Sequence, residues 1–171
     1  MPHPNLYIET ERLFIRPFTP DDIEASYAMN LEEEVSRYTG DGGVVSKKEI
    51  ERRIMHDVLG DYKKHGYGRL AVELKEERKF IGFTGLKYLE DMNEVDLGYR
   101  FMKNYWGRGI ATESAKASIN LGFETLGLTR IIAMVLPENI GSIRVLEKLH
   151  FKYEKEVEEE GQLVSLYSLK K

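Results

Sequence analysis

The segment that most constrains the fold is residues 104–114, NYWGRGIATES, where two glycines one residue apart separate two different sequence patterns. Residues 94–101, EVDLGYRF, precede it and are rich in the branched and aromatic side chains typical of strands. Apolar residues then recur at helical spacing as far as Gly127, a residue type that commonly ends helices. Amides at a helix start lack intrahelical partners, and glycines let a phosphate approach them closely. The segment is therefore either a tight strand-to-helix turn or a phosphate-binding loop.

Two familiar phosphate-binding motifs do not fit this segment. The P-loop pattern G-x-x-x-x-G-K-[ST] occurs nowhere in the chain. The dinucleotide fingerprint G-x-G-x-x-G begins at Gly107 and Gly109 but fails at Thr112, where the third glycine is required. The segment also follows three strand-like runs, whereas the fingerprint follows the first strand of a β-α-β unit. A pyrophosphate-binding loop of another kind and a turn without a ligand remain.

The other elements follow from hydrophobic periodicity and from turn residues. Strands are predicted at 12–18, 67–75, 80–90, 94–101, 130–136, 151–159 and 162–169, and helices at about 20–30, 46–65, 109–126 and 139–149. Short polar gaps between the second, third and fourth strands favour an antiparallel meander. The order β-α-α-β-β-β-α-β-α-β-β predicts a mixed α/β (α+β) domain on one central sheet of about seven strands, flanked by about four helices.

Capping residues mark two of the predicted helix starts. Thr19 is expected to be an N-cap, with Asp22 at the third helical position. Ser46 is expected to open the next helix, with Glu49 as its capping-box partner. Between these helices, residues 38–43, YTGDGG, are expected to form a loop because of their glycines.

Length and composition exclude several classes of protein. A chain of 171 residues is long enough for one domain spanning 1–171. Its net charge of -4 argues against a nucleic-acid partner held by general positive charge. The absence of cysteine excludes disulfides, thiolate zinc sites and a cysteine nucleophile. The histidines show no H-E-x-x-H or i, i+4 pairing, so no metal site is expected at His3, His56, His65 or His150.

The sequence also carries no sign of secretion or membrane insertion. The first ten residues, MPHPNLYIET, have neither the basic region nor the apolar region of a signal peptide. No run approaches the roughly 20 apolar residues that a membrane span needs. A cytoplasmic protein without a membrane partner is therefore expected.

Two motifs together carry a resemblance to a known family. NYWGRGIATES resembles motif A, Q/R-x-x-G-x-G/A, of the GNAT acetyltransferase superfamily, and residues 138–151, ENIGSIRVLEKLHF, resemble its later segment N-x-x-S-x-x-v-l-x-K-x-G-F. Residues 9–22, ETERLFIRPFTPDD, and 96–101, DLGYRF, are similar to the branch of ribosomal-protein N-terminal acetyltransferases (RimJ/RimL-like). The resemblance covers nearly the whole chain in order. It implies the GNAT fold.

The resemblance implies acetyl-CoA as cosubstrate and a metal-free reaction. Its pyrophosphate would be held by backbone amides at the start of the helix after motif A, with Arg108 adding positive charge. Asn104 stands where Gln or Arg is usual, at a position thought to contribute mainly backbone. The cofactor contacts implied are Asn104, Gly107, Arg108, Gly109, Ile110, Ala111, Thr112, Asn139 and Ser142.

The implied reaction is direct attack of a primary amine on the thioester carbonyl. In the family, the strand before motif A parts from its neighbour and offers a free amide to that carbonyl, which makes Leu97 or Gly98 the candidate donor here. Asp96 matches an acidic position of many relatives, and Glu94 faces the same side if strand alternation is unbroken. Either could accept the proton of the amine, and Asp96 is preferred. Alternatively, both are solvated strand carboxylates.

The leaving thiolate needs a proton, for which many relatives use a tyrosine. Leu146 occupies that position here and cannot donate one. Ser142 is the RimL-like substitute, although it could also be an ordinary serine at a helix start. Asn139 is expected to be the N-cap of this helix and a hydrogen-bond partner for the pantetheine or substrate amides. His150 replaces the glycine that normally ends the motif, which puts the helix C-cap in doubt.

The acceptor is the least defined part of the resemblance. A protein N-terminal amine is the first choice, a small amine such as a polyamine, amino acid or antibiotic is the second, and a catalytically idle CoA-binding sensor is a rival. Arg37, Tyr38 and the following GDGG lie where relatives line the acceptor site. The acidic run at 154–162, EKEVEEEGQ, is expected to be a solvated hairpin or a field that attracts a cationic substrate. The resemblance also admits a homodimer.

Overall fold

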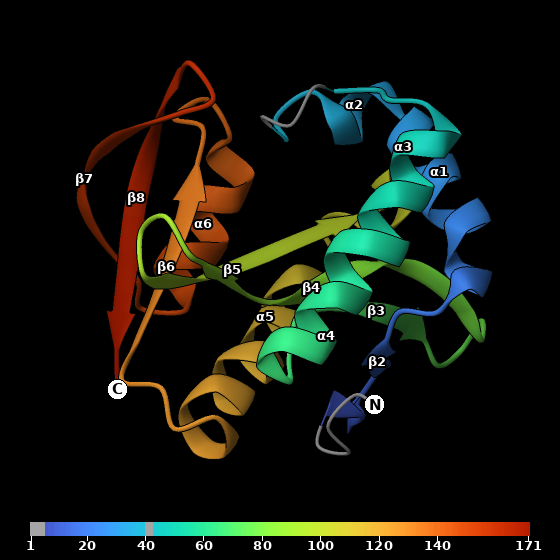
Figure 1. Cartoon of the computed structure of the whole chain (residues 1–171), viewed down its shortest axis with the longest axis horizontal. Coiled ribbons are helices and arrows are strands. Elements are labelled where there is room, and N and C mark those ends of the chain that lie inside the picture. The colour runs from blue at the N-terminus through green and yellow to red at the C-terminus, as the bar shows by residue number, and fades with distance from the viewer. Residues whose placement is uncertain (1–5, 40–42) are drawn as a thin grey trace.

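One mixed sheet organises the molecule (Figure 1). The computed structural model describes residues 6–39 and 43–171, and within them eight strands run in the order β1-β2-β3-β4-β5-β6-β8-β7. The strands are β1 (Ile8–Glu9), β2 (Leu13–Pro17), β3 (Arg69–Leu74), β4 (Lys79–Leu89), β5 (Glu94–Phe101), β6 (Arg130–Val135), β7 (Lys152–Glu159) and β8 (Gln162–Lys170). All seven predicted strands are present. The additional β1 has two residues, too few to produce a periodic pattern.

The sheet is antiparallel except at its centre. β3, β4 and β5 form the predicted meander, and β6, β8 and β7 form a second antiparallel group. The two groups meet where β5 runs parallel to β6. The sheet is therefore two antiparallel blocks joined along one parallel seam.

Helices cover both faces of this sheet. They are α1 (Ile23–Leu31), α2 (Glu33–Ser36), α3 (Lys47–Arg52), α4 (Leu59–His65), α5 (Ile110–Asn120) and α6 (Ile140–Lys148). A π-helical segment (Arg53–Val58) joins α3 to α4, and another (Leu121–Thr125) extends α5. The predicted helices are confirmed, and the short α2 was not predicted. None of the helices within residues 6–39 and 43–171 is long and apolar enough to cross a membrane.

The helix starts follow their capping residues. Thr19 and Asp22 form a complete capping box ahead of α1. The Ser46 side chain accepts a hydrogen bond from the Glu49 amide, as predicted. The second bond of a capping box, from the Ser46 amide to the Glu49 carboxylate, was wrongly expected, because that carboxylate binds Arg52 and Arg53 instead.

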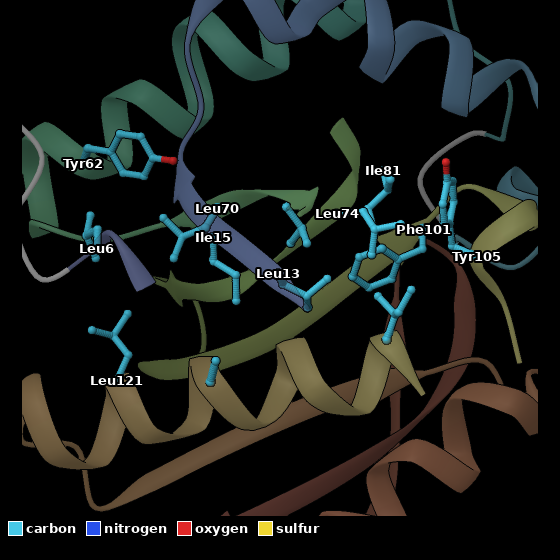
Figure 2. Packing of buried hydrophobic residues seen from close by; sticks show 13 residues of the cluster. Leu6, Leu13, Ile15, Tyr62, Leu70, Leu74, Ile81, Phe101, Tyr105 and Leu121 are labelled. Atoms are coloured by element: carbon cyan, nitrogen blue, oxygen red, sulfur yellow. The ribbon is translucent and has the colours of Figure 1, made fainter. Parts of the chain in front are cut away.

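Alternating residues of β3 divide the core between the two faces. Leu70 and Val72 pack in a cluster with residues of β2 and α5, whereas Ala71 packs with residues of α1 and α3. Figure 2 shows the first cluster, in which Leu13 and Leu70 lie between the strands and α5. Each such buried aliphatic side chain contributes roughly 1.5–3 kcal/mol. This packing fixes α5, and with it the loop that precedes α5.

The C-terminus of α6 is closed by a residue in the left-handed conformation. His150 has φ 71, and its amide donates to Glu147 O while the amide of Phe151 donates to Leu146 O. These two bonds form a Schellman motif, with the buried Phe151 and Leu146 as its hydrophobic contact. As expected, the C-cap carries backbone strain, because His150 has a positive φ. The Schellman motif nevertheless forms.

We expect His150→Gly to raise the free energy of unfolding by about 0.5–1 kcal/mol. Glycine relieves the strain of a positive φ, although it also loses more backbone entropy on folding. Chemical denaturation monitored by circular dichroism measures the change. His150→Ala is the matched control, because it removes the imidazole and keeps the strain. Equal stability of the two variants would contradict the assignment to backbone conformation.

Candidate active site

The glycine pair of NYWGRGIATES forms the loop that leads into α5. Gly107 and Gly109 have φ 72 and φ 78, and Gly109 is the N-cap of α5. The first helical bond runs from the Glu113 amide to Gly109 O, so the preceding amides lack intrahelical acceptors. A Cβ built on Gly107 meets nothing within 4 Å among the described residues. The loop is an exposed helix start with room for an anion.

An ion pair ties this loop to the beginning of the chain. The Glu113 carboxylate accepts hydrogen bonds from the Thr10 hydroxyl at 2.6 Å and from the Arg12 guanidinium at 2.8 Å. Arg12 also donates to the backbone oxygen of Arg108 at 2.7 Å. Burial acts to raise the pKa of Glu113, but these bonds outweigh it and lower that pKa. The loop is thus held from outside by residues about one hundred positions earlier.

Side chains around the loop take different environments. Ile110 is buried and anchors the first turn, whereas Asn104 and Arg108 are exposed. The guanidinium of Arg108 lies 5.4 Å from the ring centre of Tyr105. Trp106 is 46% exposed, and its indole donates to Phe101 O at 2.8 Å. A cation and an aromatic side chain therefore border the loop on its solvent side.

The parallel seam between β5 and β6 is short. Within the described chain, Asp96 opposite Ile132 is the only register pair that joins them. Figure 1 shows the two strands diverging from there, β5 towards the right and β6 towards the top of the view. The Met134 amide, two residues further along β6, donates to the Asp96 carboxylate. That side chain therefore caps the seam at the point where the strands part.

Asp96 is buried and paired with Arg69, a residue that sequence reasoning missed. Arg69 donates to an Asp96 carboxylate oxygen at 2.6 Å, to Asp96 O at 2.9 Å and to Gly85 O at 2.6 Å. Burial raises the pKa of Asp96, and the Arg69 charge opposes that shift. Glycine residues make the pairing feasible, since Arg69, Gly85 and Gly98 form a row across β3, β4 and β5. Arg69 thus reaches across two strands through a slot that only glycine leaves open.

Glu94, the other expected carboxylate, lies elsewhere. It accepts two bonds of 3.0 Å from Arg130, which also binds Glu154 of β7. Along β5 it lies five positions from Tyr99, whose hydroxyl contacts the start of α6, or roughly 16 Å of extended strand. The structure therefore pairs Glu94 with the β6–β7 region and leaves Asp96 nearer the parting of the strands.

The start of α6 brings together the two residues of the second motif. The Asn139 side chain accepts a bond from the Ser142 amide at 3.2 Å, which makes Asn139 the N-cap. The Ser142 hydroxyl lies 2.9 Å from the hydroxyl of Tyr99 on β5. Leu146, one turn later, is buried in the core. Sequence reasoning passed over Tyr99 because an aromatic residue on a strand has the same pattern whether it packs or reacts.

The expected acceptor residues lie beyond α2. Arg37 follows the last residue of α2, and Tyr38 is 39% exposed. Residues 40–42 of the predicted GDGG loop lie outside the described residues. In Figure 1, α2 lies towards the same end of the view as the tip of β6, which leads into α6. Of the residues the structure describes, no group of three His, Asp or Glu side chains could hold a metal ion.

Comparison with known proteins identifies the family of the chain. A family model described as "Acetyltransferase (GNAT) domain" matches residues 12–152, which include the glycine loop, Asp96 and Ser142. The chain belongs to the GNAT acetyltransferases. It is therefore an acyltransferase, and the expected membership of the GNAT superfamily is confirmed. GNAT acetyltransferases use acetyl-CoA.

Individual relatives of this GNAT enzyme differ in what their names record. The "uncharacterized N-acetyltransferase YoaA" of Bacillus subtilis (strain 168) is 32% identical over 148 residues, 86% of this chain and 83% of that protein. A spermidine N(1)-acetyltransferase of Escherichia coli (strain K12) is 26% identical over 150 residues, 84% of this chain and 74% of that protein. The structure of RimL, a ribosomal L7/L12 alpha-N-protein acetyltransferase in complex with coenzyme A, shares the fold, with a TM-score of 0.79 and 18% identity over 94% of this chain and 95% of that one.

We expect Gly98→Ala to lower the free energy of unfolding by about 1–3 kcal/mol, because it overpacks the slot of Arg69. The added Cβ would lie 2.6 Å from Arg69 Cζ, too close for that guanidinium to remain. Gly60→Ala in α4 is the control, since its Cβ meets nothing within 4 Å among the described residues. Denaturant unfolding of both variants measures the difference. A Gly98→Ala protein as stable as Gly60→Ala would mean that the slot imposes no constraint.

Proposed function

We propose that this GNAT enzyme transfers the acetyl group of acetyl-CoA to a primary amine, and that a protein N-terminal α-amine is the acceptor. The observation that carries the proposal is the Ser142 hydroxyl, held 2.9 Å from Tyr99 at the start of α6, beside the parting of β5 and β6. Support for the acceptor comes from the fold shared with RimL and from the RimL-like serine in ENIGSIRVLEKLHF.

The loop before α5 has the features required to bind a pyrophosphate. Its glycines have positive φ, its first amides lack helical acceptors, and the position of a Gly107 Cβ is open. Backbone amides from Gly107 to Thr112 would bind the phosphate oxygens, with Asn104 contributing backbone and Arg108 a screened charge. Asn139 would bind pantetheine amides through the part of its side chain that the Ser142 amide leaves free. Bound acetyl-CoA supplies a thioester carbonyl open to attack.

The parted strands would supply the polarising group. Beyond Asp96, β5 has no register partner on β6 in the part of the chain that the structure describes. A backbone amide further along that edge of β5 can therefore donate to an oxygen that carries developing negative charge. The amide of Leu97, the expected donor, adjoins the Asp96–Ile132 register pair and is used within the sheet. Such preorganised donors act strongly because they need no reorganisation during the reaction.

Two side chains would handle the protons of the transfer. As the amine nitrogen bonds to the acetyl carbon and the carbon–sulfur bond breaks, Asp96 accepts the amine proton and Ser142 donates its hydroxyl proton to the departing sulfur. A carboxylate has about four acceptor positions, and Arg69 and Met134 supply two donors to Asp96. The remaining lone pairs of Asp96 can accept the amine proton. Solvent then returns a proton to Ser142 and removes one from Asp96. We prefer Asp96 to Glu94 because Asp96 lies at the register pair where β5 and β6 part, whereas Glu94 binds Arg130, which also binds Glu154 of β7.

The test of this function is release of CoA from acetyl-CoA in the presence of N-terminal peptides, polyamines, amino acids and aminoglycosides. Turnover with peptides, absent when the peptide amine is blocked, would support the proposal. Turnover only with small amines would move the enzyme to the second class. Binding of acetyl-CoA without turnover on any amine would indicate a sensor, and no binding would contradict the cofactor assignment.

We expect Ser142→Ala to lower kcat roughly 10- to 100-fold, because the leaving sulfur loses its proton donor. The dissociation constant for acetyl-CoA should change little, since the backbone loop before α5 does the binding. Steady-state kinetics and isothermal titration calorimetry measure the two quantities separately. An unchanged kcat would remove the role assigned to Ser142.

We expect Asp96→Asn to lower kcat/KM roughly 100-fold and to remove the acid limb of the pH–rate profile. A general base works deprotonated, so the rate falls as pH falls through its pKa. Because burial raises the pKa of Asp96, the wild-type limb should lie above the ordinary range of a carboxyl group. Glu94→Gln is the comparison variant. If it removes the limb and Asp96→Asn does not, Glu94 is the base.

A small cationic amine is the second candidate acceptor, and one observation favours it. Burial and the nearby carboxylates of Asp91, Glu160 and Asp96 raise the pKa of Glu159. Carboxylates of β7, the β7–β8 turn, the β4–β5 turn and the seam thus share one negative field. Such a field concentrates cations, and a relative with 26% identity is named as a spermidine acetyltransferase.

A further inference from the structure

Tyr99 is the partner of the Ser142 hydroxyl, although the two residues are 43 positions apart in the chain. Tyr99 lies on β5 opposite Thr84 of β4, three residues beyond the seam pair at Asp96. Its ring packs against the core cluster that contains Leu97 and Leu146. The hydroxyl end of this side chain thus meets the first turn of α6 from the sheet side.

The protonation state of the Tyr99 phenol is well defined. Burial raises the pKa of Tyr99 to about 12, and the bond with Ser142 only partly offsets that rise. The phenol therefore keeps its proton at any pH near neutrality. Such a group is a permanent hydrogen-bond donor.

Two oxygens of Ser142 lie within reach of the phenolic proton. The Tyr99 hydroxyl lies 2.9 Å from Ser142 Oγ and 3.2 Å from Ser142 O. Hydrogen bonds between hydroxyl and oxygen atoms normally span 2.5–3.0 Å, so Oγ is the nearer partner, and in this pair either hydroxyl can be the donor.

When the phenol donates to Ser142 Oγ, the serine proton has no acceptor in the described part of the protein. A serine hydroxyl has one proton and two lone pairs, and the phenol occupies one of the lone pairs. In the part of the chain that the structure describes, Ser142 Oγ has no other partner. By contrast, Ser114 in α5 donates to Ala111 O at 3.0 Å, the usual arrangement within a helix.

We propose that Tyr99 is a positioning residue that acts through Ser142. By donating to Ser142 Oγ, it prevents the serine proton from pointing back at the sheet and turns it towards the departing sulfur. This inference rests on the proposed function, in which Ser142 protonates that sulfur. Tyr99 itself touches neither substrate.

The first test is a double-mutant cycle of Tyr99→Phe and Ser142→Ala. Tyr99→Phe should lower kcat about 10-fold, the effect of one lost hydrogen bond, and leave the KM for acetyl-CoA within about 2-fold. Because Tyr99 acts only through the serine, adding Tyr99→Phe to Ser142→Ala should cause no further loss. Tyr167→Phe is the matched control, a buried tyrosine of β8 in the same core cluster, and it should keep wild-type kcat.

Three results would overturn the inference. They are an unchanged kcat for Tyr99→Phe, an equal loss for Tyr167→Phe, and a multiplicative loss in the double variant. The last would give the two residues independent roles. Thermal melts of every variant establish that folded proteins are compared. If the wild-type enzyme releases CoA with none of the amines tested, the proposed function itself fails. That outcome is distinct from failure of this inference, because the double-mutant cycle requires an active wild type.

A second variant retains the hydroxyl and changes only its acidity. A polyfluorinated tyrosine at position 99 keeps the ring and the bond to Ser142 but ionises near neutral pH. As pH rises through its pKa, the phenolate stops donating and accepts the serine proton, so kcat should fall in a range where the wild-type rate is level. A profile identical to wild type would overturn the inference, because a purely structural role does not depend on that proton.

Discussion

The ion pair between Arg69 and Asp96 is the contact on which the rest of the site depends. It lies where two antiparallel blocks of sheet share one register pair, and its carboxylate also binds the Met134 amide that β5 leaves without a partner. A buried charge of this kind is costly unless it is paired and hydrogen-bonded. Here the pairing requires glycine at two positions of the neighbouring strands. Separation of β5 from β6 is therefore built into the sheet before any ligand arrives.

Two helix starts flank the strands that part, and they serve different chemistry. The start of α5 offers bare amides and open space, which suit a phosphate. The start of α6 is already capped by Asn139, and its Ser142 hydroxyl bonds to the hydroxyl of Tyr99. In the proposed function, the same local structure, a helix N-terminus after a strand, would bind the cosubstrate in one case and take part in the reaction in the other. The difference lies in whether a side chain has satisfied the amides.

Hydrophobic periodicity, together with turn and capping residues, was enough to predict the strands, the main helices and both helix-start motifs. They failed where an element has too few residues to show a period, as in β1 and α2. At the site, Gly107, Gly109, Asn139 and Ser142 could be found because they form local motifs. Arg69 and Tyr99 could not, because each acts across strands or across 43 residues of chain, and the register that joins them is a property of the folded sheet. The pairing of Glu94 with Arg130 was hidden for the same reason.

The bond from Arg12 to the backbone of Arg108, together with the Arg12–Glu113 ion pair, has a thermodynamic consequence. Docking of the first strands and ordering of the loop before α5 are one coupled equilibrium. A ligand that orders the loop must therefore stabilise the attachment of β1 and β2 by the same free energy, since linkage is reciprocal. The stability of the sheet edge furthest from the β5–β6 seam therefore depends on whether the loop before α5 is occupied.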